Sequence, residues 1–229
     1  MKILVVEDDR KSAEILRNGL TANSHTVDVA YDGADGSFLG RSFLYDAIIL
    51  DYSMPKKNGL EVCKEIRAIG KQTPIIFLSV TDDPTLKVEA FDKGANDYMV
   101  KPYSLQELYA RLRIASGHSH LGKSAILKVD DLSLDSDRHI TMRGNTTIRL
   151  TRKEFSLLEY LMQNIGIVIS RALLMEHVWT ADSDPFSNTI ETHIRNLRKK
   201  INVGKKPNLI LNIPGRGYVI DTVSRLKKH

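Results

Sequence analysis

Polar side chains that could carry out phosphoryl-transfer or metal chemistry follow four short apolar runs of the chain. Clustered carboxylates repel one another unless a cation joins them, and hard divalent ions such as Mg²⁺ prefer carboxylate and carbonyl oxygens. A hydroxyl and an ammonium group beside them could hold the oxygens of a transferred phosphoryl group. The residues concerned are Glu7, Asp8, Asp9, Asp51, Ser79 and Lys101.

The apolar runs are the expected strands of a sheet that positions these side chains. Five β-rich runs alternate with amphipathic helical patterns, which predicts a parallel sheet with helices on both faces. The carboxyl ends of parallel strands meet at one edge, so we expect the acids, the hydroxyl and the lysine to converge there. The runs span residues 3–6, 26–29, 47–50, 75–78 and 98–100.

Asp51 is the candidate nucleophile of this edge. A cation held between Glu7, Asp8 and Asp51 would orient one Asp51 oxygen toward a phosphorus atom, and an acyl phosphate would form. Lys101 would pair with the phosphoryl oxygens, and Ser79 would hydrogen-bond to one of them. The alternative is that these acids only cap helices and begin loops, which explains each of them better when taken singly. Their joint placement at one edge favours the chemical interpretation.

The pattern changes after a short polar segment, where a linker is expected. Short strands with turns come next, then three helical patterns, and a hairpin with its turn at Pro214–Gly217 closes the chain. This order predicts an α+β domain. The predicted division is a first domain at residues 1–117, a linker at 118–125 and a second domain at 126–229.

Basic character belongs to the second half of the chain. Residues 1–120 hold 15 Lys+Arg and 17 Asp+Glu, whereas residues 121–229 hold 18 and 11. This asymmetry suggests that the second domain binds a polyanion, with a solvated basic surface as the alternative. The third helical pattern carries an apolar stripe at Ile190, Ile194, Leu197 and Ile201.

That stripe directs cations and short polar side chains outward, as a helix in a DNA major groove requires. A solvated helix face is the alternative. Arg216, between two glycines in the hairpin turn, could enter a minor groove or meet the DNA backbone. The helix residues expected to contact DNA are Thr189, Thr192, His193, Arg195, Asn196, Arg198, Lys199 and Lys200.

The composition favours a cytoplasmic protein without a membrane segment. Cys63 is the single cysteine, so an internal disulfide is excluded, and no paired Cys/His spacing suggests a zinc site. The apolar run near the start is too short for a signal peptide, and no later run approaches the roughly 20 residues of a membrane span.

Four motifs of the first domain resemble the successive motifs of receiver domains in bacterial response regulators. The resemblance covers nearly all of residues 1–117 and implies a flavodoxin-like, doubly wound, parallel five-stranded α/β sheet. It further implies that Asp51 is the phosphoacceptor, and that Ser79 and Tyr98 rearrange on phosphorylation, although Tyr98 could also be an aromatic residue at the edge of the core. The implied Mg²⁺ ligands are Glu7, Asp8, Asp51 and the backbone carbonyl of Ser53. The motifs are Val5–Asp9, Leu50–Pro55 with Gly59, Leu78–Ser79 and Asp97–Pro102.

Four motifs of the second domain resemble the winged-helix effector domain of the OmpR/PhoB family, over about residues 126–223. The resemblance makes residues 188–201 the recognition helix and Pro214–Tyr218 the wing. The motifs are Leu150–Phe155, Ser170–Leu174 with Val178–Trp179, Thr192–Lys200 and Gly215–Tyr218.

The two resemblances imply a transcriptional regulator of a two-component system. A sensor histidine kinase would phosphorylate Asp51, and phosphorylation would raise the affinity for double-stranded promoter DNA, with RNA polymerase as a further candidate partner. An Mg²⁺-dependent aspartyl-phosphate hydrolase is an alternative, but Ser53 stands where many such hydrolases have a second aspartate. We therefore expect slow self-dephosphorylation and no enzymatic turnover. A DNA-binding regulator with a phosphorylation-independent receiver is a third possibility, and the complete set of site residues weighs against it.

A phosphorylation-favoured homodimer is expected through the last helix and last strand of the first domain and the helix before them. The resemblance points to Lys87 with Glu107 and to Asp97 with Arg111, each pair repeated about a twofold axis. Exposed charges without a partner copy are the alternative, since single exposed pairs contribute only about 0 to 1 kcal/mol. The full set is Lys87, Glu89, Asp92, Asp97, Glu107, Arg111 and Arg113.

Overall fold

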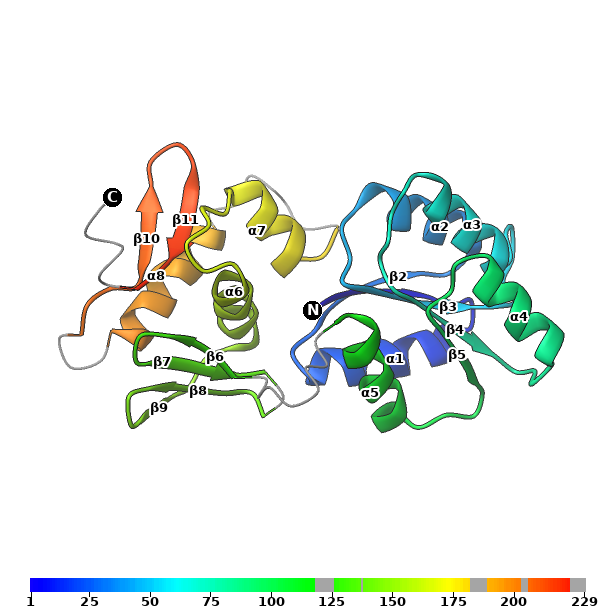
Figure 1. Cartoon of the computed structure of the whole chain (residues 1–229), viewed down its shortest axis with the longest axis horizontal. Helices are drawn as coiled ribbons and strands as arrows, with labels where there is room; N and C mark the ends of the chain where they lie inside the picture. The colour runs from blue at the N-terminus through cyan, green and yellow to red at the C-terminus, as the bar shows by residue number, and fades with distance from the viewer. Residues whose placement is uncertain (118–125, 137, 182–188, 203–205, 223–229) are drawn as a thin grey trace. The chain divides into compact units, whose positions relative to one another are not determined.

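The computed structural model divides the chain into two compact units, Met1–Ser119 and His120–His229 (Figure 1). The structure describes residues 1–117, 126–136, 138–181, 189–202 and 206–222, and the predicted linker at 118–125 lies outside them. No helix within these ranges is both long enough and apolar enough to cross a bilayer.

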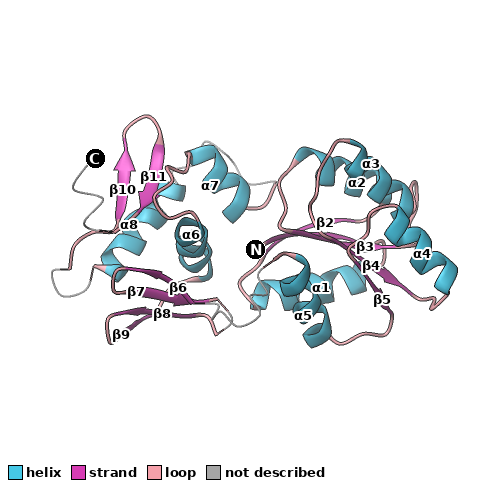
Figure 2. Cartoon of the chain, in the orientation of Figure 1, coloured by secondary structure: helices cyan, strands magenta, loops and turns pink. Residues whose placement is uncertain are grey.

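The first unit is a five-stranded parallel sheet in the order β2-β1-β3-β4-β5, which confirms the predicted fold. Helices α1 and α5 cover one face, and α2, α3 and α4 cover the other (Figures 1 and 2). The strands are β1 (Lys2–Val6), β2 (Thr26–Ala30), β3 (Ala47–Asp51), β4 (Ile75–Ser79) and β5 (Asp97–Val100). The helices are α1 (Arg10–Ala22), α2 (Gly33–Ser42), α3 (Gly59–Ala68), α4 (Pro84–Asp92) and α5 (Leu105–Ala115).

Local sequence signals explain where the helices nearest the carboxyl edge begin. The Asp9 carboxylate accepts a hydrogen bond from the Ser12 N–H at 2.7 Å and caps α1, so the capping interpretation holds for this acid. Asn58 and Glu61 form a capping box at the start of α3. These caps fix the helix starts, so that three residues connect β1 to α1 and seven connect β3 to α3.

Within its described residues, the second unit contains an antiparallel sheet, three helices and a terminal hairpin, as the sequence pattern predicts. The sheet has the order β6-β7-β8-β9, and a bridge between Ile169 and Tyr218 ties the segment before α7 to the hairpin. The sheet strands are β6 (Ile126–Val129), β7 (Leu132–Asp135), β8 (Ile140–Arg143) and β9 (Thr146–Ile148). The remaining elements are α6 (Arg152–Gln163), α7 (Arg171–Val178), α8 (Thr189–Ile201), β10 (Ile210–Ile213) and β11 (Gly217–Ile220).

The predicted apolar stripe of α8 is confirmed, because its four residues are almost completely buried. They join one core with side chains of α6 and α7, including Leu158, Leu161 and Leu174. Burial of this stripe sets the rotation of α8 about its axis, which decides the residues that face outward.

Gly59 packs directly behind the residue expected to carry the phosphoryl group. A methyl group there would lie 2.4 Å from the Asp51 carbonyl oxygen and 2.7 Å from the Phe77 ring. We therefore expect Gly59→Ala to destabilise the first unit by about 1 to 3 kcal/mol through overpacking. Urea unfolding followed by far-UV circular dichroism measures the change.

The fluorescence of Trp179, the one tryptophan of the chain, gives an internal control because it reports the second unit. Its transition should not move. Asn18→Ala, at an exposed position of α1, should change stability by less than about 0.5 kcal/mol. A Gly59→Ala protein as stable as the wild type would contradict the close packing.

Candidate functional site

Glu7, Asp51 and Lys101 converge at the carboxyl edge of the parallel sheet, from the ends of β1, β3 and β5. The Lys101 Nζ lies 2.7 Å from the Glu7 Oε2 and 3.1 Å from the Asp51 Oδ1. Carboxylate oxygens of Glu7, Asp8 and Asp51 lie within 4.8 Å of one another. The structure thus brings together the acids and the lysine that the strand pattern placed at this edge.

The two inner carboxylates are almost hidden from water. Glu7 is 2% exposed and Asp51 is 7% exposed, whereas Asp8 is exposed. Burial raises the pKa of both Glu7 and Asp51, although the bonded Lys101 opposes the rise. Burial alone would lower the pKa of Lys101, but its bond to Glu7 and the charge of Asp51 outweigh that effect and raise it. One ammonium group is therefore shared by two carboxylates.

The donor set suits a hard divalent cation. Three carboxylates outnumber the single ammonium, so a divalent ion would reduce the repulsion that remains. The acidic cluster that the resemblance to receiver domains implied is present, formed by Glu7, Asp8 and Asp51. Ser53 lies in the exposed loop two residues after Asp51, and its role as a backbone ligand stays a prediction.

Ser79 and Tyr98 are connected through Thr81, a residue that the sequence patterns did not single out. The buried Ser79 Oγ accepts a hydrogen bond from the Thr81 N–H at 3.2 Å. The hydroxyl of the buried Tyr98 donates to the Thr81 carbonyl oxygen at 3.0 Å. No side-chain pattern could reveal this connection, because both bonds are made by the Thr81 backbone.

The charged face of α4, β5 and α5 holds ion pairs within one chain. Both Asp97 oxygens accept from the Arg111 Nη1, at 3.0 and 2.9 Å, and Glu107 accepts from the same guanidinium. Lys87 pairs with Asp82. The ion pair between Asp97 and Arg111, expected between two copies, is therefore formed within the single chain. Three further members of the predicted interface are exposed: Glu89, Asp92 and Arg113.

Four of the described residues of α8 are exposed, namely Glu191, Thr192, Arg195 and Lys199, and Asn196 is partly exposed beside them. Glu191 pairs with Arg171 of α7 at 3.2 Å. The outward strip is defined here as Thr192, Arg195, Asn196 and Lys199. Arg216 is exposed in the hairpin turn. The side chain of Thr189 lies outside the described part of the structure. Cations and short polar groups on one strip are the groups that phosphate and base-edge contacts require.

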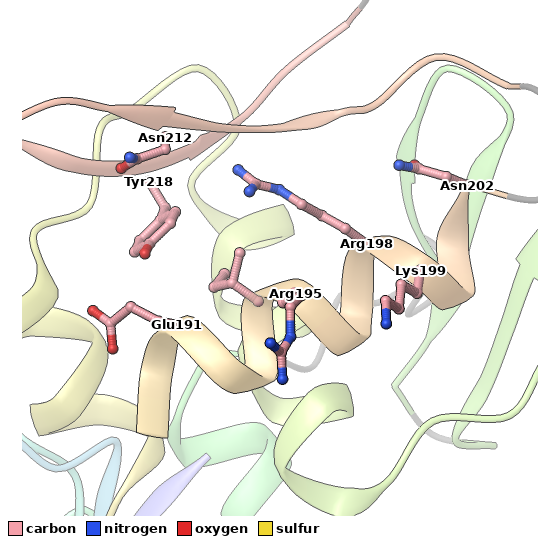
Figure 3. A pocket seen from close by; sticks show the side chains of 8 residues that line it. Glu191, Arg195, Arg198, Lys199, Asn202, Asn212 and Tyr218 are labelled. Carbon is pink, nitrogen blue, oxygen red and sulfur yellow. The ribbon is translucent and has the colours of Figure 1, made fainter. Parts of the chain in front are cut away.

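One flank of α8 faces the hairpin instead of solvent. The Arg198 Nε donates to the Ile210 carbonyl oxygen at 2.9 Å, and its guanidinium lies 6.0 Å from the Tyr218 ring centroid. In Figure 3, Arg198 reaches toward the hairpin, whereas Arg195 and Lys199 point away from it. A concave pocket of about 580 Å³ lies here, lined by Glu191, Ile194, Arg195, Arg198, Lys199, Asn202, Asn212 and Tyr218.

The other flank of α8 faces the start of α6. Lys200 pairs with Glu154 at 2.6 Å, and the His193 ring lies 5.6 Å from the Trp179 ring. Arg198, His193 and Lys200 were all predicted as DNA contacts, and in the structure contacts inside the domain engage each of them. Helical periodicity predicted the side of α8 on which these side chains lie. It did not predict which residue each side chain would contact.

Two family models match the two units. The model described as "Response regulator receiver domain" matches residues 3–113, and "Transcriptional regulatory protein, C terminal" matches residues 145–220. Response regulator MprA of Mycolicibacterium vanbaalenii is 40% identical over 224 residues, which cover 96% of this chain and 97% of that protein. MprA of Mycobacterium tuberculosis is 38% identical over 223 residues, with the same coverage.

Among solved structures, response regulator DrrB, a Thermotoga maritima OmpR/PhoB homolog, is 28% identical. That match covers 96% of this chain and 98% of DrrB, with a TM-score of 0.46. A receiver-type acidic site on a parallel sheet, followed by a DNA-binding domain, defines a two-component regulator. The chain belongs to the response regulators of the OmpR/PhoB type. A receiver domain implies a histidine kinase partner, and the second domain implies DNA binding.

The outward strip of α8 generates a prediction about sequence readout. Asn196→Ala should relax discrimination between DNA sequences by about 1 to 3 kcal/mol at one base pair, because an amide contact to a base edge is lost. Binding isotherms on a duplex selected from a randomised pool, and on its single-base variants, measure this. Lys199→Ala is the matched control, and it should weaken all duplexes about equally. Identical behaviour of the two variants would show that this strip does not face the bases.

Proposed function

We propose that this response regulator is activated by transfer of a phosphoryl group from a sensor histidine kinase to Asp51. Phosphorylation then promotes dimerisation and binding to promoter DNA, with RNA polymerase as a further partner. The observation that carries the proposal is the convergence of Asp51 with Glu7 and Lys101 at one edge of the sheet. The basic outward strip of α8 supports the DNA-binding part.

The geometry suggests which atom of Asp51 reacts. Its Oδ1 accepts hydrogen bonds from the Lys101 Nζ and from the Tyr52 N–H, so Oδ2 is the oxygen left to attack phosphorus. The P–N bond of the kinase phosphohistidine breaks as a P–O bond to Asp51 forms. Lys101 then pairs with the phosphoryl oxygens, and the Ser79 hydroxyl donates to one of them.

Glu7, Asp8, Asp51 and the Ser53 carbonyl would hold Mg²⁺, which when bound neutralises charge on the transferred group. We propose that the protein does not turn over external substrates. Ser53, two residues after Asp51, offers no carboxylate to activate a leaving group or a water molecule. Slow loss of the chain's own phosphoryl group by attack of water is the remaining hydrolytic reaction.

Phosphorylation provides the direct test. Incubation with acetyl phosphate and Mg²⁺ should add one phosphoryl group to the wild type and none to Asp51→Asn, because the amide is a poor nucleophile. Intact-protein mass spectrometry measures this. Asp8→Asn should bind Mg²⁺ more weakly, because a neutral ligand replaces a carboxylate, and titration calorimetry measures that affinity.

Asp9→Asn is the matched control, since Asp9 caps α1 and asparagine caps equally well. This variant should be phosphorylated like the wild type. Full labelling of Asp51→Asn would refute the assignment of Asp51, and unchanged Mg²⁺ affinity of Asp8→Asn would remove Asp8 from the ligand set.

A test of the proposed dimer must avoid Asp97 and Arg111, because these two residues already form an ion pair within one chain. Exchanging Asp97 and Arg111 would restore their bond inside one chain, so it cannot report on a second copy. Lys87 and Glu107 lie on different helices and bond to other partners, Asp82 and Arg111. Lys87→Glu and Glu107→Lys should each lower the dimer fraction of phosphorylated protein, and the double exchange should restore much of it.

Sedimentation velocity of the phosphorylated proteins measures these fractions. Arg17→Glu, an exposed charge reversal on α1, is the control and should leave the dimer intact. Full dimerisation of both single variants would refute this interface.

A further inference from the structure

Two consecutive residues in the first turn of α6 hold the other two helices of the DNA-binding domain. The Lys153 Nζ donates to the carbonyl oxygen of Val178, the last residue of α7, at 2.6 Å. The Glu154 Oε2 accepts from the Lys200 Nζ of α8 at 2.6 Å and from the Thr151 N–H at 2.8 Å. The start of α6 is therefore a junction of all three helices.

The pair between Glu154 and Lys200 is unequal in exposure. The Glu154 side chain is 4% exposed and that of Lys200 is 37% exposed. A carboxylate with so little access to water requires a cation and hydrogen-bond donors. Burial would raise the pKa of Glu154, but its bonds to Lys200 and Thr151 outweigh that effect and lower it. The carboxylate is therefore ionised at neutral pH, and it compensates the charge of Lys200.

The position of Lys200 on α8 agrees with this assignment. His193 and Lys200 are seven residues apart, so they lie on the same flank of the helix. The His193 ring packs beside Trp179, at the end of α7. This flank is turned toward α6 and α7, while Lys199 is exposed on the outward strip and forms no ion pair with the described residues.

We propose that Glu154 is a positioning residue for DNA binding. Its carboxylate neutralises Lys200 and sets the orientation of the recognition helix. As a result, Lys199 binds a DNA phosphate and Lys200 does not. The proposal rests on the proposed DNA-binding function and deepens it. A phosphate bound to Lys200 would have to compete with Glu154 and would leave a nearly buried carboxylate without its cation. No comparable cost opposes a phosphate bound to Lys199.

The salt dependence of DNA binding distinguishes the two lysines. Each neutralised phosphate contributes about 0.9 to the slope of log affinity against log salt concentration. Fluorescence anisotropy with a labelled random-sequence duplex, at several KCl concentrations, measures this slope for the full-length protein. Lys199→Met should lower the slope by about one, and Lys200→Met should leave it unchanged.

Two further variants test the role of Glu154. Glu154→Gln retains an acceptor for the Thr151 N–H but removes the charge, so it should free Lys200 and raise the slope by about one. The double variant Glu154→Gln/Lys200→Met should return to the wild-type slope. A purely structural role would change affinity without changing the slope, and that result would overturn the proposal.

Equal loss of slope in Lys200→Met and Lys199→Met would also overturn it. Circular dichroism checks folding, and if Glu154→Gln does not fold, the comparison of the two lysine variants decides. A wild type without affinity for any duplex would instead refute the DNA-binding function, so the two failures are distinguishable.

Discussion

The receiver domain depends on an imbalance of charge at one edge of its sheet. Two nearly buried carboxylates, Glu7 and Asp51, share the single ammonium group of Lys101, and the exposed Asp8 adds a third negative charge. Three separate strands are needed to bring these groups together, and the close approach of Gly59 fixes the backbone behind Asp51. Because burial raises the pKa of both inner carboxylates, the unliganded site is under electrostatic strain. A divalent cation bound there would reduce that repulsion and would stabilise the folded domain, by an amount that grows with the logarithm of its concentration once that exceeds the dissociation constant.

In the DNA-binding domain, some cations of α8 are exposed to solvent, and others are bound to groups of the same domain. The apolar stripe of α8 is buried, one flank holds the hairpin through Arg198, and the other meets Glu154 through Lys200. Thr192, Arg195 and Lys199 are left exposed, together with Glu191. Of the four cations of α8, Arg195 and Lys199 are exposed, whereas Arg198 and Lys200 are engaged within the domain. Net charge alone would overestimate the number of phosphate contacts.

Much of this could be predicted from the sequence, because strand alternation and helical periodicity are local signals. They placed Asp51 and Lys101 at one edge of the sheet, and they placed Lys199 on the outer side of its helix. The interaction partners of long side chains were harder to predict. An arginine or lysine can reach several neighbours, and the sequence does not indicate which of them it will contact. The bond of Arg111 to Asp97 within one chain and that of Lys200 to Glu154 both depend on how elements pack. Hydrogen bonds made by the backbone, such as those of Thr81, cannot be predicted from the type of the residue.

Thr81 connects the acidic site to the face proposed for dimerisation. Its N–H bonds to Ser79 beside Asp51, and its carbonyl oxygen holds the hydroxyl of Tyr98, whose ring lies 5.7 Å from the Lys87 ammonium on α4. In the proposed activation, a phosphoryl group that draws the Ser79 hydroxyl toward Asp51 would alter the first bond, and a shift of Thr81 would alter the second. Each neutral hydrogen bond contributes about 0.5 to 1.5 kcal/mol, so the loss of both would supply a coupling of at most about 1 to 3 kcal/mol. That range corresponds to a change of roughly 5-fold to 150-fold in affinity. In the proposed dimerisation, a coupling of this size would bias the equilibrium between monomer and dimer without making phosphorylation an absolute requirement for either state.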